Sequence, residues 1–150
     1  MRDDTAAKLR AYCGTVLEFP TLDPPLQVDL RAPVPADLRG TLAAAGLATP
    51  FAIITAFNPR SEPTDEADNQ RRDAELTAQL GSRSWLRADG CSPDRSHREP
   101  GVAVALSGSE ARELAVRFDQ DAFFWFDGAR FWIRAAAESF GPVRLPCPGV

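Results

Sequence analysis

Apolar residues occur along the chain in short segments whose spacing predicts both strands and helices. The segment Phe51–Ala56 is nearly all apolar and lies between two prolines, which is typical of a central strand buried on both faces. Val102–Leu106 predicts a second buried strand for the same reason. Leu26–Leu30 alternates apolar and polar side chains, so we expect a half-buried strand that pairs with the extended segment Thr15–Phe19 as a hairpin.

Four helices are predicted from capping residues and helical periodicity. The first is expected over Ala6–Tyr12 and a short second one over Ala36–Ala45. The third is expected over Asp65–Leu80, with Thr64 as its N-cap. The fourth follows a cap at Ser109 and should turn one apolar stripe towards a sheet. This stripe consists of Ala111, Leu114, Ala115 and Phe118.

The clearest hairpin signal lies near the C-terminus. Asp127-Gly128 favours a tight turn between the aromatic segments Phe123–Phe126 and Arg130–Ile133. Six large aromatic side chains are enough to make both faces of this hairpin apolar, and we interpret them mainly as core residues. The alternative is that the hairpin Phe123–Trp132 forms the interface of a homodimer or stacks on a ring of a ligand.

The order of these elements predicts the fold class. From Phe51 onwards it is strand, helix, strand, strand, helix, strand, with a strand at Trp85–Ala88 and a polar loop over Gly90–Gly101. This order matches a ferredoxin-like, or split βαβ, arrangement better than a doubly wound α/β sheet, because only a loop joins two of the strands. We therefore expect one α+β domain, 1–150, with a mixed β-sheet and helices packed on it. An N-terminal β-hairpin and a C-terminal hairpin strand would extend the ferredoxin-like core.

The strand, loop and helix from Phe51 to Arg72 form the strongest candidate for a binding site, because helix N-termini after strands often bind anions. Two interpretations stay open. The polar side chains of this segment either tie the loop Asn58–Ser61 to the helix, or they orient a bound ligand. The candidate ligand-binding residues are Asn58, Arg60, Ser61, Asn69, Arg72 and Gln120.

If this segment binds a ligand, its arginines, hydroxyl group and helix N-terminus favour an anionic small molecule or a nucleotide-like ligand. The chain has neither a Walker loop nor a G-x-G-x-x-G motif, so a standard nucleotide site is not expected. An enzyme that uses Asp65, Glu66 or Asp73 as a base or metal ligand in the same cleft is the alternative. No motif names a catalytic residue, a cofactor or a reaction.

The charge balance excludes some partners. The 17 basic and 21 acidic residues give a net charge of -4 without a basic block, which argues against a general nucleic-acid surface. No apolar run approaches the ~20 residues that span a bilayer, and the residues after Met1 do not resemble a secretory signal. We therefore expect a cytoplasmic protein that does not enter a membrane.

Cysteine and histidine are too scattered to predict a metal site. Cys13, Cys91 and Cys147 form no C-x-x-C pair, and His97 is the single histidine. An odd number of widely spaced cysteines is not typical of a disulfide framework, so we expect reduced thiols. We interpret His97 as a solvated loop residue rather than as part of a nucleophilic site.

Several short motifs carry a resemblance to a known family. They are the T-A-x-N-P-x-S segment (Thr55, Ala56, Asn58, Pro59 and Ser61), Asn69 with its neighbouring arginines, and Phe118-Asp119-Gln120 before an aromatic strand. Tyr12-Cys13-Gly14-Thr15 is similar to the family's Tyr-x-x-Thr opening. On these residues the chain resembles an uncharacterised, largely bacterial family, domain of unknown function 3293. The resemblance implies a small single α/β-type domain of unknown activity, without established catalytic or cofactor residues.

Overall fold

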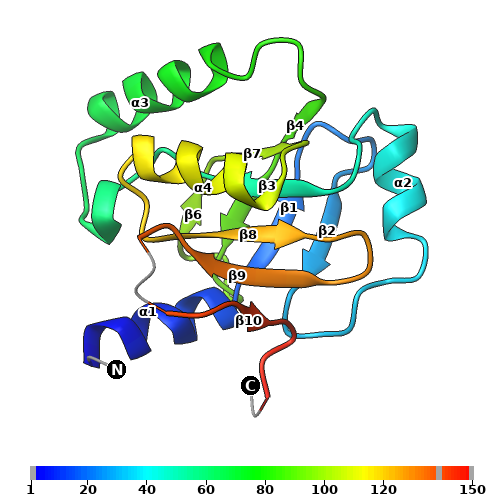
Figure 1. Cartoon of the computed structure of the whole chain (residues 1–150), viewed down its shortest axis with the longest axis horizontal. Coiled ribbons are helices and arrows are strands. Elements are labelled where there is room, and N and C mark those ends of the chain that lie inside the picture. Colours follow the sequence, from blue (N-terminus) through cyan, green and yellow to red (C-terminus); the bar gives the residue numbers. More distant parts are fainter. Residues whose placement is uncertain (1–2, 138–139, 149–150) are drawn as a thin grey trace.

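The computed structural model describes residues 3–137 and 140–148, which build two β-sheets with helices around them (Figure 1). The larger sheet has the strand order β10-β9-β8-β3-β7-β4, and the smaller sheet has the order β2-β1-β5-β6. Helices α3 and α4 cover one face of the larger sheet, and the smaller sheet packs against its other face.

The bounds of the elements are as follows. The helices are α1 (Asp3–Cys13), α2 (Leu38–Ala44), α3 (Glu66–Ala78) and α4 (Gly108–Arg117), and η1 (Pro59–Ser61) is a 3-10 turn. The larger sheet contains β3 (Phe51–Ile54), β4 (Trp85–Arg87), β7 (Val102–Val104), β8 (Ala122–Phe126), β9 (Phe131–Ala135) and β10 (Val143–Arg144). The smaller sheet contains β1 (Val16–Phe19), β2 (Leu26–Asp29), β5 (Asp89–Cys91) and β6 (Arg98–Glu99).

Strand β3 is the buried centre of the larger sheet, as its apolar sequence predicts. All of its residues are buried, and it pairs with β7 on one side and with β8 on the other. One apolar cluster fills the space between this sheet and helices α3 and α4, and a second cluster lies between the two sheets. The predicted α4 stripe of Ala111, Leu114, Ala115 and Phe118 belongs to the first cluster, so its orientation is confirmed.

The α+β class is confirmed, while the pairing of the strands differs from the expected mixed sheet. All described strand pairs are antiparallel. Helix α3 joins β3 to β4, but β7 lies between these two strands, so strands that run in the same direction are not neighbours. The order β8-β3-β7-β4 is compatible with the predicted split βαβ arrangement.

The N-terminal hairpin forms as predicted, but its partner strands were expected to be a loop. Strand β1 pairs with β2 and, along its other edge, with β5, which in turn pairs with β6. The prediction of a continuous polar loop over Gly90–Gly101 is therefore wrong for these residues. Gly90 and charged residues occupy most of the two short strands, so they lack the apolar alternation that would reveal them. Backbone hydrogen bonds to the edge of β1 hold them in the sheet.

Two helices begin with caps other than those predicted. Asp65, not Thr64, is the N-cap of α3, and its carboxylate accepts a hydrogen bond from the Asp68 backbone N–H at 2.8 Å. Ser107, not Ser109, caps α4, because Glu110 three residues later completes a capping box with it. Both caps satisfy backbone N–H groups that the first helical turn leaves without a partner.

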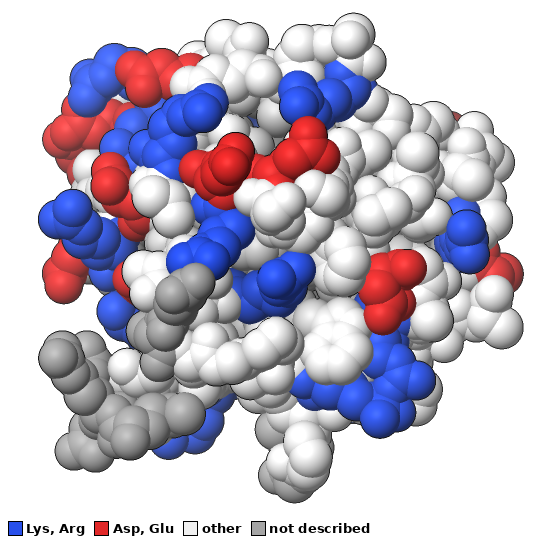
Figure 2. Space-filling view, viewed as in Figure 1, with Lys and Arg blue, Asp and Glu red and all other residues white. Residues whose placement is uncertain are grey.

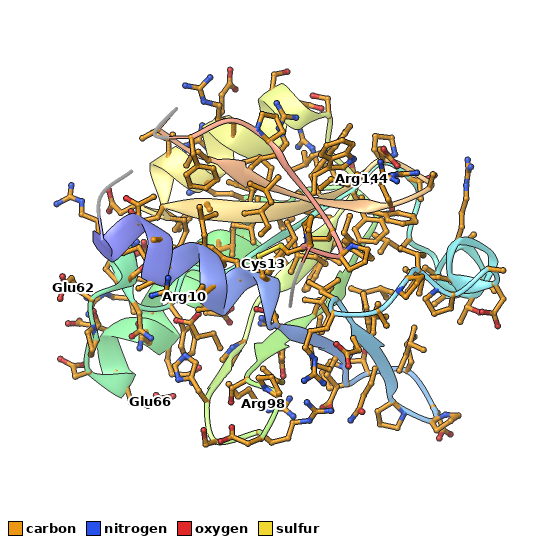
Figure 3. All side chains as sticks on the ribbon, turned by 90° about the horizontal axis from the view of Figure 1, so that it is seen from below. Arg10, Cys13, Glu62, Glu66, Arg98 and Arg144 are labelled. Carbon is orange, nitrogen blue, oxygen red and sulfur yellow. A yellow bond between two sulfur atoms is a disulfide. The ribbon has the colours of Figure 1, made fainter. Side chains whose placement is uncertain are left out.

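The expectation of reduced thiols is wrong for two of the three cysteines. Cys13 at the end of α1 forms a disulfide with Cys147, with 5.8 Å between the two Cα atoms (Figure 3). Strand β10 pairs with β9 and returns the chain beside α1, which brings together cysteines that are 134 residues apart in sequence. The spacing of cysteines along the chain does not indicate which of them lie close together in the fold. Cys91 stays free and buried.

The aromatic hairpin formed by β8 and β9 contributes to the core. Its four phenylalanines are buried, and the indole N–H of Trp125 donates to the backbone oxygen of Leu106 at 3.2 Å. Among the described residues, Val116 on α4 is the only large hydrophobic side chain that is exposed. A homodimer interface on this hairpin would need an exposed apolar patch, and none of the large hydrophobic side chains of the hairpin is exposed in the described part of the chain.

Charged side chains of both signs are interspersed on the face shown in Figure 2. They are densest at the upper left, where α3 lies in Figure 1, and they form no broad basic surface on this face. Within residues 3–137 and 140–148, no helix has the length and apolar character needed to cross a bilayer.

Candidate functional site

The loop between β3 and α3 has an uncommon backbone conformation. Asn58, Arg60 and Ser61 have φ values of 50°, 57° and 62°, in the left-handed region that residues other than glycine seldom adopt. Strained backbone of this kind persists only where its surroundings hold it, and it is concentrated at functional sites. Side chains from α3 supply much of the support here.

Asn69 on α3 fastens the start of the loop. It is only 4% exposed, accepts a hydrogen bond from the Asn58 backbone N–H at 2.9 Å, and donates to Asn58 Oδ1 at 3.0 Å. Its side-chain amide also donates to the backbone oxygen of Thr64 at 3.2 Å. Because the loop satisfies this buried amide, the contacts of Asn69 support a structural role.

Arg72 ties the same loop to the end of α4. Its Nε donates to the backbone oxygen of Ala56 at 2.9 Å, and its Nη2 donates to the backbone oxygen of Phe118. Arg60, by contrast, has a side chain that is 78% exposed and lies 3.8 Å from the carboxylate of Asp119. The sequence suggested that both arginines hold a ligand together with Ser61; in the structure Arg72 contacts backbone oxygens and Arg60 lies near Asp119.

A cavity of about 570 Å³ lies beside the loop. It is surrounded by α1, the end of β3, the loop, the β5 and β6 strands and the start of β8, and no α3 residue lines it. Part of its wall is apolar and comprises Ile53, Ile54, Phe123 and Phe124. Polar residues from at least four segments also line it, among them Tyr12, Asn58, Glu99 and Gln120, and Ser61 lies on the same segment as Asn58. Pockets for small molecules typically have about 300–1,000 Å³ and combine an apolar wall with a few polar groups.

A hydrogen-bonded cluster forms one edge of this cavity. Ser61 Oγ donates to Asp121 Oδ2 at 2.7 Å, and Lys8 Nζ donates to the same oxygen at 2.8 Å. Burial alone would raise the pKa of Asp121, but the hydrogen bonds from Lys8 and Ser61 bring it below its ordinary value. Asp121 is therefore a carboxylate that holds the loop and α1 together.

Tyr12 is the chain's single tyrosine and gives this cavity a spectroscopic signal. Burial raises the pKa of Tyr12 to about 12, with further contributions from the carboxylates of Asp121 and Glu99 and an opposing one from Ser61. We expect phenolate absorbance to be absent from the native protein at about pH 10.5, whereas the protein unfolded in urea should titrate near pH 10. Since the native state holds this proton more tightly, stability should fall as the pH rises from about 10 towards 12. A native midpoint near 10 would contradict the burial of Tyr12.

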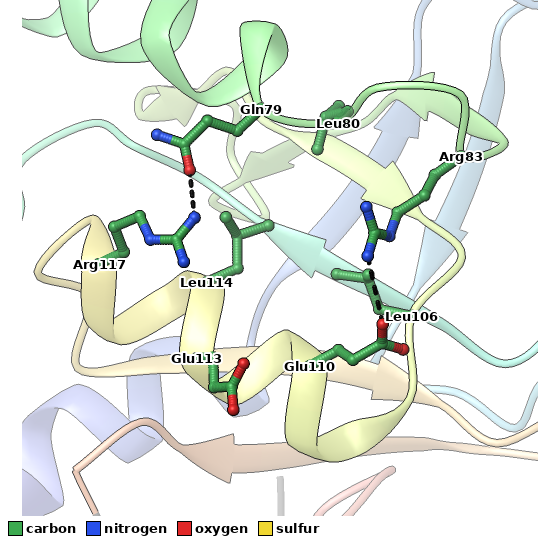
Figure 4. A pocket seen from close by; sticks show the side chains of 8 residues that line it. All are labelled: Gln79, Leu80, Arg83, Leu106, Glu110, Glu113, Leu114 and Arg117. Carbon is green, nitrogen blue, oxygen red and sulfur yellow. Dashed lines mark hydrogen bonds and ion pairs between the residues drawn. The ribbon is translucent and has the colours of Figure 1, made fainter.

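A second pocket of about 120 Å³ lies between the end of α3 and α4 (Figure 4). Arg83 donates to Glu110 at 3.2 Å, and Arg117 donates to Gln79. Because these exposed side chains pair with one another, the pocket offers few groups to a ligand. The cavity beside the loop is therefore the stronger candidate.

The loop, α3 and α4 lie in the part of the chain that is similar to a known family. Residues 54–123 match the family model described as Protein of unknown function (DUF3293). The resemblance to DUF3293 drawn from the motifs is thus confirmed over this segment, which runs from the end of β3 to the second residue of β8. No curated protein and no solved structure matches the chain.

The structure brings three of the six predicted site residues to the cavity, namely Asn58, Ser61 and Gln120. The other three hold or flank the loop in the DUF3293 segment. Gln120 Nε2 donates to the backbone oxygens of Phe57 and Phe118, both at 3.2 Å, so it also supports the loop. Sequence reasoning missed Lys8, Arg10 and Tyr12 as lining residues. The sequence feature that could have indicated Tyr12 is the Tyr-x-x-Thr opening, which lies outside the segment that matches DUF3293.

The carboxylates of the enzyme hypothesis lie outside the cavity. Asp65 caps α3, Gln70 donates to Glu66 at 2.6 Å, and Asp73 accepts two hydrogen bonds from Arg87, each at 2.8 Å. None of the three acidic residues lines the cavity. In the described part of the chain, no three His, Cys, Asp or Glu side chains are placed to hold a metal ion.

Proposed function

We propose that this protein binds an anionic small molecule with an apolar body in the cavity between α1 and the Asn58–Ser61 loop. One observation carries the proposal. Residues of the motifs that carry the resemblance come from separate parts of the sequence, and six of them line this one cavity, four of them within the matched residues 54–123. They are Tyr12, Thr15, Thr55, Asn58, Ser61 and Gln120.

The character of the cavity supports a ligand with an apolar body. Ile53 and Phe124 are directly paired on neighbouring strands and lie on the same face of the larger sheet, so a ring or branched chain would cover contiguous apolar surface there. Hydrophobic contact of this kind supplies affinity, and a small number of polar groups fix orientation.

Arg10 supports the anionic character of the ligand. It lies on α1 at the cavity, its side chain is exposed, and no described residue forms an ion pair with it (Figure 3). A guanidinium group in this situation can bind a carboxylate through two hydrogen bonds. The phenol of Tyr12, which keeps its proton over the ordinary pH range, adds a hydrogen-bond donor.

The surroundings of the α3 N-terminus do not favour an anion there. Asp65 already accepts a hydrogen bond from a first-turn N–H, and Glu66 and Asp68 add negative charge there. These acidic side chains already interact with the positive end of the helix dipole, and their negative charges would repel a phosphate. The anion site is therefore proposed at Arg10 and not at the helix N-terminus that the sequence suggested.

A thermal-shift screen with phenylpropionate, benzoate and adenosine monophosphate tests the proposal. A bound compound at 100 times its Kd adds about 2.7 kcal/mol of stability, which raises the melting temperature of a domain of this size by roughly 5–10 °C. We expect this rise with the aromatic carboxylates, and we expect Arg10→Ala to abolish it. Arg39→Ala is the matched control, since Arg39 is an exposed arginine on α2 that does not line the cavity. A rise that both variants retain would contradict the proposed anion site.

A further inference from the structure

Glu99 is the one acidic side chain among the described residues that line the cavity. It lies on β6, its side chain is 30% exposed, and its Oε1 accepts a hydrogen bond from Asn58 Nδ2 at 2.8 Å. His97 Nε2 is 3.9 Å from the same oxygen, which is too far for a hydrogen bond. An ionised carboxylate has about four acceptor positions, so Glu99 retains capacity for another donor.

Two charged side chains of opposite sign at the cavity can interact with a ligand. Lys8 and Asp121 form an ion pair with 2.8 Å between Nζ and Oδ2, so their charges largely cancel. Arg10 and Glu99 remain, on α1 and β6, respectively. Because these two charges are of opposite sign, the cavity favours neither a ligand with two negative charges nor a ligand with only a positive charge.

The region near Tyr12 favours a positively charged group. The ring of Tyr12 packs edge to face against that of Phe124, with 5.9 Å between the ring centroids. Aromatic faces attract ammonium groups, and the attraction grows where water is partly excluded. Burial is the main reason for the raised pKa of Tyr12, and the negative charges of Asp121 and Glu99 act in the same direction. Glu99 therefore lies close enough to Tyr12 for an ammonium group that binds its carboxylate to lie beside this ring.

We infer that the ligand is a free hydrophobic α-amino acid. Such a molecule carries an ammonium group, a carboxylate and an apolar side chain. Its ammonium group bonds to Glu99 beside the aromatic rings, and its carboxylate faces Arg10. Its side chain lies along Ile53 and Phe124, which lie on the same face of the larger sheet. This inference rests on the proposed function and specifies the ligand class of the same site.

Isothermal titration of the whole protein with three matched probes tests the inference. The probes are free phenylalanine, phenylpropionate, which lacks the amine, and phenethylamine, which lacks the carboxylate. We expect phenylalanine to bind at least about tenfold more tightly than either, because hydrogen bonds between charged groups contribute this much where they are partly buried. Glu99→Gln should remove the advantage over phenylpropionate, and Arg10→Ala should remove the advantage over phenethylamine.

Glu99→Gln keeps an oxygen that can accept the Asn58 hydrogen bond, so the loop is expected to stay intact, and an unchanged melting temperature verifies this. Glu75→Gln, an exposed glutamate on α3, is the control for the loss of a negative charge. Equal binding of phenylalanine and phenylpropionate, unaffected by Glu99→Gln, would overturn the inference and leave the proposed function standing. Binding of phenethylamine alone, or of no probe at millimolar concentration, would overturn both.

Discussion

Replacing Cys13 by serine is expected to lower the free energy of unfolding by about 2–5 kcal/mol. The disulfide to Cys147 closes a loop of 134 residues, which is nearly the whole chain, so its removal frees the unfolded state more than a short loop would. Both cysteines are also buried in the cluster between the two sheets. Urea unfolding of wild type and Cys13→Ser, followed by far-UV circular dichroism, measures the difference.

Three controls separate the crosslink from local packing. Cys147→Ser should lose as much stability as Cys13→Ser, and the double variant should lose no more than either, because all three lack the same bond. A dithiol reductant should lower the stability of the wild type to that of the variants and leave the variants unchanged. If reductant leaves the wild type unaffected while mass spectrometry shows free thiols, the disulfide is not a stabilising bond.

Replacing Asn69 by alanine is expected to lower the free energy of unfolding by about 1–3 kcal/mol. The change removes hydrogen bonds to the backbone and side chain of Asn58 and to the backbone of Thr64, and it leaves buried polar groups without partners. The loop should then lose its left-handed conformation, and ligand binding in the cavity should weaken as a consequence. Urea unfolding together with titration of phenylpropionate measures both effects.

Gln70→Ala is the matched control for Asn69→Ala. Gln70 is the next residue on α3, but its side chain is exposed and its hydrogen bond to Glu66 lies on the helix surface. We expect it to change stability by less than about 0.5 kcal/mol. Loss of ligand binding by Asn69→Ala with unchanged stability would show instead that Asn69 contacts the ligand.

The parts of the fold that follow from local sequence patterns were predictable. Phe51–Ala56 has no polar residue before Thr55, so only a strand buried on both faces suits it. The aromatic hairpin has its turn signal at Asp127-Gly128, and the α4 stripe has the spacing of one helical face. These features depend on residues within about ten positions of each other.

The parts that depend on long-range approach were not predictable from one sequence. Cys13 lies beside Cys147 only because β10 pairs with β9. Segment β5 is a strand only because its backbone pairs with the edge of β1. The candidate site shows the same limit. Asn69 and Arg72 have the polarity expected of ligand-binding residues, but their partners are groups of the loop and, for Arg72, also the backbone oxygen of Phe118. Polarity alone does not distinguish a side chain that holds a loop from one that binds a ligand.

The most direct measurement is a titration of nitrogen-labelled protein with phenylpropionate, followed by amide chemical shifts in NMR spectra. We expect saturable shifts at Tyr12, Ser61 and Gln120, which line the cavity from three segments of the chain. We expect no shifts at Gln79 and Arg117, which line the smaller pocket between α3 and α4. Shifts confined to that smaller pocket, or none up to millimolar concentrations, would contradict a binding site beside the Asn58–Ser61 loop.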